Sequence, residues 1–202
     1  FSTREQQHRP FELCGYLSDD GDGLVNQAIQ GLVTDNFGAD SWVKIKEKAG
    51  VTEETFLSNQ IYDDSVTFNL AGAASQVLSM PLGDVLHAFG KYWVLKVGQQ
   101  KYGTLMKSGG DSLMEFLVNL PNFHSRVMLI YSDIRPPEFK IEKTDDRTLL
   151  VHYFSTREGL TDFMGGLIAG LAEMYKTEAT ITCVNSRAQG HDHDVFQVVT
   201  IP

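Results

Sequence analysis

Two consecutive prolines, Pro136 and Pro137, divide the sequence into halves that follow different hydrophobic periods. Proline fixes its own φ angle and pushes the preceding residue, here Arg135, toward extended conformations, so a helix cannot continue through this point. Before the prolines, apolar residues recur at the spacing of an amphipathic helix; after them, apolar and polar residues alternate as in a strand. The break therefore predicts an α+β fold in which an N-terminal helical part comes first.

Helix signals are dense in the first half. One apolar stripe begins at Leu24 and stops at Gly38, and a second stripe ends at Gly50. Ser65 can cap a third helix, and Pro81 can open a fourth whose stripe includes Leu82, Val85, Leu86, Phe89 and Trp93. These segments predict a helical assembly.

A longer amphipathic run starts near Asp111, and Pro121 is expected to bend or interrupt it. Its apolar face contains Leu113, Phe116, Leu117, Leu120, His124, Val127, Met128 and Tyr131. His124 stands where the pattern calls for leucine, so its imidazole is expected to face the interior. A lone histidine on such a face is more often a neutral core residue bonded to a backbone carbonyl than a metal ligand. The residues alone leave both interpretations open.

The second half predicts a small, mainly antiparallel sheet. Period-two segments lie around 139–141 and 149–153, a helical stripe covers 160–171, and two more strand-like segments follow at 179–185 and 195–201. Four strands joined largely by short turns favour antiparallel pairing, with the helix packed on one face.

The end of the second strand carries the pattern Tyr153-x-Ser155-x-Arg157. Alternation would place the three polar groups on one face, about 6.6 Å apart. A guanidinium binds a carboxylate through two parallel hydrogen bonds, and two hydroxyls and a following helix N-terminus add further donors. The pattern suits an anion, although for the motif alone an exposed strand end with Arg157 paired to an acidic neighbour is the favoured explanation.

Composition narrows the class of protein. The 17 Lys and Arg against 26 Asp and Glu give a net charge of −9, which disfavours nucleic-acid binding. Two cysteines, no membrane-length apolar run and no signal sequence predict a cytoplasmic protein without membrane insertion. Residues 1–22 end in turn-forming residues and are expected to be a leader of unknown role before a domain at 23–202.

Several segments resemble, in order, the haem nitric oxide/oxygen-binding (H-NOX) family, which includes the sensor domain of soluble guanylate cyclase. They are Gly23-Leu24-Val25-Asn26, Ile61-Tyr62-Asp63-Asp64-Ser65, Ala73-Ala74-Ser75, Glu115-Phe116-Leu117-Val118-Asn119-Leu120 with His124, Arg135-Pro136-Pro137, and Tyr153-Phe154-Ser155-Thr156-Arg157. The resemblance covers 23–201. It implies a domain with haem between its helical and sheet halves.

The resemblance also implies roles for individual residues. His124 would be the axial iron ligand, and Tyr153, Ser155 and Arg157 would anchor the haem propionates. Pro137 would press against the haem and distort it, and Phe116 would lie against it. No Cys-x-x-Cys-His attachment sequence is present, so the haem would be b-type and non-covalent.

Family members that bind oxygen stably carry a distal tyrosine, and the matching position here is Phe163. The neighbouring distal positions would be Ile29 and Trp93. Without a hydroxyl at Phe163, the resemblance implies a sensor that binds nitric oxide, and also CO, while discriminating against oxygen. Weakening or scission of the bond between iron and His124 would be the signal.

The resemblance implies a sensor domain rather than an enzyme, because the chain leaves no length for a cyclase or kinase domain. The effector would be a separate histidine kinase, cyclic-dinucleotide enzyme or guanylate cyclase, or a further C-terminal portion. Two alternatives stay open: a haem peroxidase or dioxygenase, and a haem-free ligand-binding scaffold of related fold.

Overall fold

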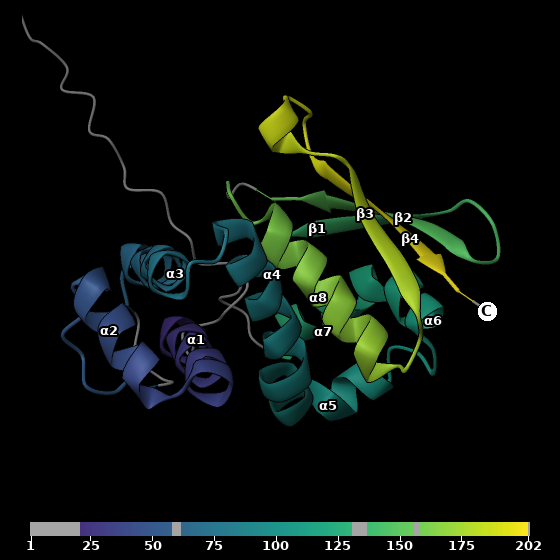
Figure 1. The fold of residues 1–202 in the computed structure, drawn as a ribbon. Coiled ribbons are helices and arrows are strands. Elements are labelled where there is room, and N and C mark those ends of the chain that lie inside the picture. The colour runs from purple at the N-terminus through teal and green to yellow at the C-terminus, as the bar shows by residue number, and fades with distance from the viewer. Residues whose placement is uncertain (1–20, 58–61, 131–136, 156–157, 202) are drawn as a thin grey trace, which may run out of the picture.

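A computed structural model of the chain describes residues 21–57, 62–130, 137–155 and 158–201. Eight α-helices, one π-helix, one 3₁₀-helix and four strands lie in these ranges (Figure 1). The elements before the proline pair are α1 (Gly21–Phe37), α2 (Ala39–Ala49), α3 (Asp64–Leu78), α4 (Leu82–Tyr92), the π-helix η1 (Trp93–Gly98), α5 (Gln99–Lys107), α6 (Leu113–Val118) and α7 (Leu120–Ile130). After it come β1 (Glu138–Lys143), β2 (Thr148–Phe154), α8 (Thr161–Met174), β3 (Ala179–Asn185), η2 (Arg187–Gln189) and β4 (Asp194–Thr200). The predicted α+β class is confirmed.

Helices α1 to α4 share a core of their own. Its most deeply buried side chains are Val33, Ile45, Phe56, Leu70 and Ala74. Glycines in positive-φ conformations end the first two helices as expected, Gly38 at φ 83° and Gly50 at φ 67°. No helix within the described ranges is long and apolar enough to cross a membrane.

Three details of the predicted helices are wrong. The cap of α3 is Asp63 rather than Ser65, because the Asp63 carboxylate accepts a hydrogen bond from the Ser65 backbone N–H at 2.9 Å. Leu82 is 46% exposed at the start of α4 and lies off its buried stripe. Met128, one helical turn after His124 on α7, is 40% exposed rather than part of the buried face.

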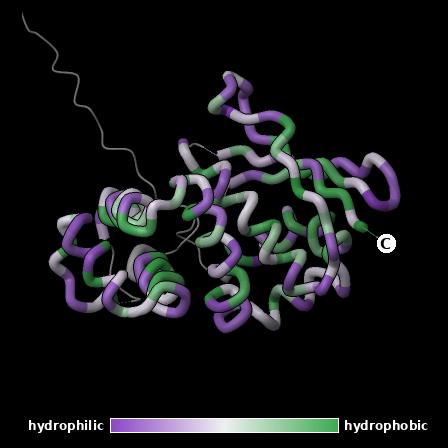
Figure 2. The backbone as a smooth tube through the Cα atoms, viewed as in Figure 1, coloured by the Kyte–Doolittle hydropathy of each residue, from purple (hydrophilic) through white to green (hydrophobic). Residues whose placement is uncertain are grey.

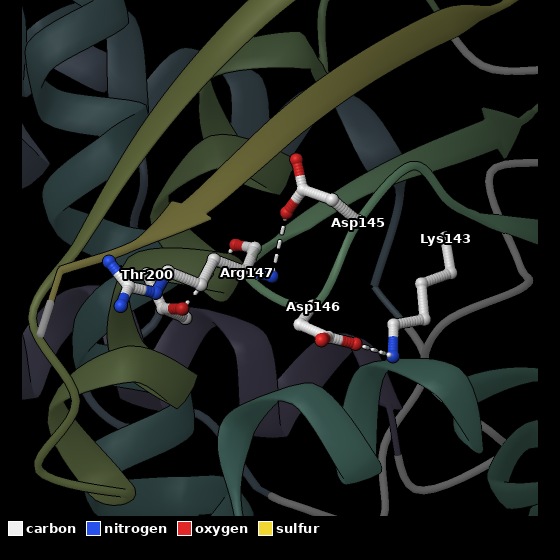
Figure 3. A network of polar contacts seen from close by, with 5 residues as sticks. All are labelled: Lys143, Asp145, Asp146, Arg147 and Thr200. Atoms are coloured by element: carbon white, nitrogen blue, oxygen red, sulfur yellow. Dashed lines mark hydrogen bonds and ion pairs between the residues drawn. The ribbon is translucent and has the colours of Figure 1, made fainter.

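The four strands form one antiparallel sheet in the order β1-β2-β4-β3. Alternation along β2 buries Leu149, Val151 and Tyr153 on one face, where Val151 pairs with Phe196 of β4. At one end of the sheet the β1–β2 hairpin is closed by polar contacts, including Lys143 to Asp146 at 2.8 Å (Figure 3). Figure 2 shows this hairpin and the β3–β4 turn as the hydrophilic tips of the sheet.

Helix α8 connects the sheet to the helices. It packs along α4 so closely that a Cβ atom on Gly166 would lie 2.0 Å from the carbonyl oxygen of His87. A Cβ on Gly90 would lie 2.2 Å from the carbonyl oxygen of Phe163. Phe163 and Trp93 each contact both hydrophobic cores, so these two rings join the α1–α4 core to the sheet core.

Candidate functional site

His124 lies on α7 with its ring turned into the sheet core. The residue is 9% exposed, and its Nδ1 donates a hydrogen bond to the Leu120 carbonyl at 2.9 Å. Burial lowers the pKa of His124 to about 4, against the Leu120 hydrogen bond, which raises it. The imidazole is therefore neutral at physiological pH and held in one orientation by a backbone partner.

A cavity opens beside His124. Its lining comes from both sides of the proline pair and consists of Trp93, Val94, Tyr102, Met106, Phe116, Leu120, Phe123, His124, Val127, Phe139, Met164, Leu167 and Leu171. Its volume is about 80 Å³. Among the lining residues, His124 is the sole side chain that could ligate a metal through nitrogen, and no carboxylate is present. This lining is suited to binding an apolar group.

A chain of aromatic contacts links His124 to the sheet. The His124 ring centroid lies 4.8 Å from that of Phe139 on β1, and Phe139 lies 5.6 Å from Tyr153 on β2. The ring of Phe123, the preceding residue, also lies 5.4 Å from the imidazole centroid and is nearly perpendicular to it. The imidazole thus contacts two phenyl rings.

The structure describes two of the three residues of the Tyr153-x-Ser155-x-Arg157 pattern, Tyr153 and Ser155. Tyr153 is buried on the cavity side of β2, as alternation predicted. The strand ends at Phe154, so Ser155 follows the sheet rather than continuing it, and its carbonyl accepts a hydrogen bond from Arg187 at 2.8 Å. Arg157 lies outside the described residues.

The other expected haem contacts divide into two groups. Phe116 and Trp93 line the cavity with His124, and Pro137 is half-buried directly before β1. Ile29 lies instead in a separate small cavity among α1, α3 and α4. Phe163 is outside the cavity lining and packs against Phe89 at 5.0 Å. The structure therefore brings Phe116, Trp93 and His124 together, but not Ile29 or Phe163.

Sequence reasoning missed the contribution of η1 and α5. Tyr102 and Met106 of α5 line the cavity, and Tyr102 stacks on Trp93 with ring centroids 6.4 Å apart. The π-helix η1 places Trp93 at the cavity. The Trp93 ring packs against Gly98, so that a Cβ atom added to Gly98 would lie only 3.2 Å from the ring. Single-turn π-helices are frequent at functional sites, but their sequence signal is weak.

The other histidines in the described part of the chain are absent from the cavity lining, and His8 lies outside the described residues. His87 is exposed on α4, and His152 lies on the outer face of the sheet, as predicted from alternation. In the 191–194 turn, His191 and Asp192 are exposed, whereas His193 is half-buried, hydrogen-bonds His152 at 2.8 Å and stacks on Phe154. Over the described ranges, no cluster of three or more His, Cys, Asp or Glu could hold a metal ion.

Comparison with known proteins identifies the family. The sequence model described as "Haem-NO-binding" matches residues 22–183. The chain is 29% identical over 175 residues to soluble guanylate cyclase gcy-32 of Caenorhabditis elegans, covering 85% of this chain and 25% of that protein. It is 30% identical over 121 residues to guanylate cyclase soluble subunit beta-2 of Rattus norvegicus, covering 57% of this chain and 18% of that protein. The chain thus spans about a quarter, or less, of the length of these relatives.

Solved structures share the fold. An H-NOX protein from S. oneidensis, in the Fe(II)NO ligation state, superposes with a TM-score of 0.78 at 20% identity, covering 89% of this chain and 99% of that chain. An H-NOX protein from K. algicida, unliganded in the Fe(II) state, superposes with a TM-score of 0.74 at 22% identity, covering 89% of this chain and 96% of that one. With the family match over most of the chain, these likenesses lead to one conclusion: the chain belongs to the haem-NO-binding (H-NOX) family of gas-sensor domains.

Proposed function

We propose that this domain binds b-type haem without a covalent link and senses nitric oxide, and that His124 would hold the haem iron. The observation that carries the proposal is the His124 ring, buried and neutral at an apolar cavity built from both halves of the chain. A histidine metal ligand usually donates its second ring N–H to a carbonyl or carboxylate, and Leu120 supplies that carbonyl. A bound haem would supply an iron that takes a diatomic gas.

The cavity is lined by side chains that suit a flat, apolar group, but it is smaller than such a group requires. The cavity volume of about 80 Å³ is below the roughly 300–1,000 Å³ typical of ligand pockets. The lining includes two flexible methionines, Met106 and Met164, and the half-buried Phe123. These side chains can change rotamer without any change in the backbone. We expect these side chains to rotate when a porphyrin enters.

Tyr153, Ser155 and Arg157 are proposed to hold the haem carboxylates. Support comes from the position of Tyr153, which is buried one ring away from His124 through Phe139, and from Ser155 directly after the strand. Pro137 stands at the start of β1, two residues before Phe139, where it can press on the same group. The apolar macrocycle of a haem would thus contact apolar side chains of the cavity, and its carboxylates would contact the polar anchors.

Selectivity for nitric oxide over oxygen is proposed from the wall that α8 contributes. Its lining residues are Met164, Leu167 and Leu171, none of which donates a hydrogen bond. Bound oxygen gains negative charge and needs such a donor, whereas nitric oxide and CO depend on it less. Phe163, one residue before Met164, keeps a phenyl ring where oxygen-binding relatives of this family carry a hydroxyl.

Signalling is proposed to pass through α7. His124 would tether this helix to the haem, and α7 also meets β1 through the contact between His124 and Phe139. Loss of the tether would let α7 shift against the sheet, and a partner would read the changed surface. We propose that the effector is a separate or fused signalling enzyme, such as a histidine kinase, a cyclic-dinucleotide enzyme or a guanylate cyclase.

Sensing is favoured over catalysis by the same lining. A haem peroxidase needs an acid/base group near the iron. Within the described part of the chain, the cavity offers no carboxylate and no histidine besides His124. We therefore place this domain among sensors rather than enzymes.

Haem titration tests the proposal. The haem-free protein should take up one equivalent of haem and develop a Soret band, and Arg157→Ala should retain less haem through gel filtration. Arg147→Ala, at the exposed hairpin on the far end of β2, is the matched control and should retain haem like the wild type. Absence of a Soret band after haem supplementation would instead support a haem-free scaffold.

A further inference from the structure

The β3–β4 turn, residues 186–193, together with Asp194 contacts both ends of the connection between β2 and α8. Figure 1 shows this turn, with η2, folded at the end of the sheet above the start of α8. Strand β3 carries a bulge at Val184, between the pairs Cys183 to Phe196 and Asn185 to Val195. Bulges re-aim the chain that follows them and are frequent beside functional sites.

Arg187 holds the first end of the connection. Its guanidinium donates to the Ser155 carbonyl at 2.8 Å, and it lies 3.9 Å from the Glu158 carboxylate. A guanidinium presents five donors in a rigid fork, so a hydrogen bond from it fixes direction as well as distance. The carbonyl of Ser155 is thereby fixed at the point where β2 leaves the sheet.

Asp194 holds the second end. The residue is 3% exposed, and one carboxylate oxygen accepts from the Thr161 hydroxyl at 2.7 Å. The other oxygen accepts from the backbone N–H of Arg187, also at 2.7 Å. The buried Asp194 carboxylate thus links Thr161, the first residue of α8, to Arg187, which hydrogen-bonds Ser155. A buried donor that lost its partner here would carry a desolvation cost.

We propose that Arg187 and Asp194 are positioning residues for haem-carboxylate binding: together they fix Ser155, a proposed anchor, at the end of β2 and Thr161 at the start of α8. The inference rests on the proposed haem function. It assigns these two residues no contact with the haem. Their effect is to hold Ser155 and the start of α8 in place before the haem arrives, so that less conformational freedom is lost on binding.

The test uses the rate at which haem passes from the ferric holoprotein to excess apomyoglobin. We expect Arg187→Gln to speed haem loss about tenfold, the effect of losing about 1.4 kcal/mol of binding free energy. Asp194→Asn should speed it as well, and because Asp194 carries negative charge, its effect cannot come from direct attraction to a carboxylate. Arg187→Lys, which keeps the positive charge and a donating ammonium group, should restore most of the wild-type rate. Arg147→Gln is the control and should match the wild type.

Amide hydrogen exchange in the haem-free protein gives a second readout. Arg187→Gln should speed exchange in peptides spanning the end of β2 and the start of α8, while the β1–β2 hairpin exchanges as before. Circular dichroism of the haem-free proteins separates a local change in exchange from general destabilisation. The thermal unfolding midpoint of Arg187→Gln should stay close to that of the wild type. Unchanged exchange and unchanged haem loss in Arg187→Gln would overturn the inference but leave haem binding by the wild type intact. A wild-type protein that takes up no haem would overturn the proposed function itself.

Discussion

At the scale of single residues, His124 illustrates what a hydrophobic pattern can and cannot predict. Its place on an apolar stripe predicted that the imidazole is buried, and the structure confirms it. The sequence analysis offered a backbone carbonyl as the partner of a buried, neutral His124, but not that it belongs to Leu120, nor that Phe139, on a strand after the proline pair, packs on the ring. Ile29 shows the opposite case, in which a residue expected near the haem lies in another cavity.

Gas selectivity is tested at this scale by two variants. We expect the ferrous wild type to form no stable oxygen complex and Phe163→Tyr to gain one. Phe163 lies outside the lining of the haem-free cavity, but it matches the distal tyrosine of oxygen-binding family members, so the new hydroxyl should act as the donor once haem is bound. Tyr102→Phe removes the hydroxyl already present in the cavity lining and should leave the response to both gases unchanged. Absorption spectra under oxygen and nitric oxide measure both effects. A wild-type oxygen complex that Tyr102→Phe abolishes would refute the proposed selectivity and identify Tyr102 as the donor.

His152 predicts a pH dependence of stability. Burial, and then the neighbouring His193, lower the pKa of His152, with Lys140 acting in the same direction and Glu142 and Asp192 opposing. The unfolded chain therefore binds a proton at His152 more readily than the folded one, so the free energy of unfolding should fall as the pH drops through the usual histidine value of about 6.5. In urea unfolding at pH 7.5 and 5.5, His152→Gln should reduce this fall. His191→Gln, at an exposed position of the same turn, should not. An equal fall in His152→Gln and wild type would contradict the assignment.

At the scale of helices and strands, most elements follow from sequence period and from glycine and proline positions. The proline pair separates helices from strands as expected, and the four strands lie close to their predicted ranges. The sequence analysis ended the fourth helical stripe at Trp93 and did not predict the π-helix η1 or helix α5, because the polar run Gln99-Gln100-Lys101 interrupts the apolar residues between 93 and 107. Tertiary packing decides their conformation: Trp93 contacts both cores at once.

The contact between α4 and α8 gives a prediction at this scale. Gly166→Ala would place a methyl group against the His87 carbonyl, a rigid backbone atom, so the helices must separate. We expect a loss of roughly 1–3 kcal/mol in the free energy of unfolding. Gly103→Ala in α5, where nothing lies within 4 Å of the added Cβ, should instead raise stability by about 0.5–1 kcal/mol. Chemical denaturation measures both, and a Gly166→Ala variant as stable as the wild type would contradict the close packing.

At the scale of the whole molecule, two cores meet at Trp93 and Phe163. The His124 cavity belongs to the sheet core, whereas α1 to α3 pack in the other. Haem should therefore stabilise the two parts unequally. We expect removal of haem to increase amide hydrogen exchange in α5, α7 and β1 more than in α2 and α3. A uniform increase across both cores would show that haem binding stabilises the molecule as one unit.

The central claim is that His124 ligates a haem iron that responds to nitric oxide. Absorption spectra of the ferrous protein under argon, oxygen and nitric oxide, recorded for wild type and His124→Gly, test it most directly. We predict a five-coordinate wild-type spectrum under argon, no change under oxygen and a shifted Soret band under nitric oxide. His124→Gly should lose the argon spectrum and regain it with added imidazole, while His87→Gly, at an exposed position, should match the wild type. Identical argon spectra for His124→Gly and the wild type would contradict the claim.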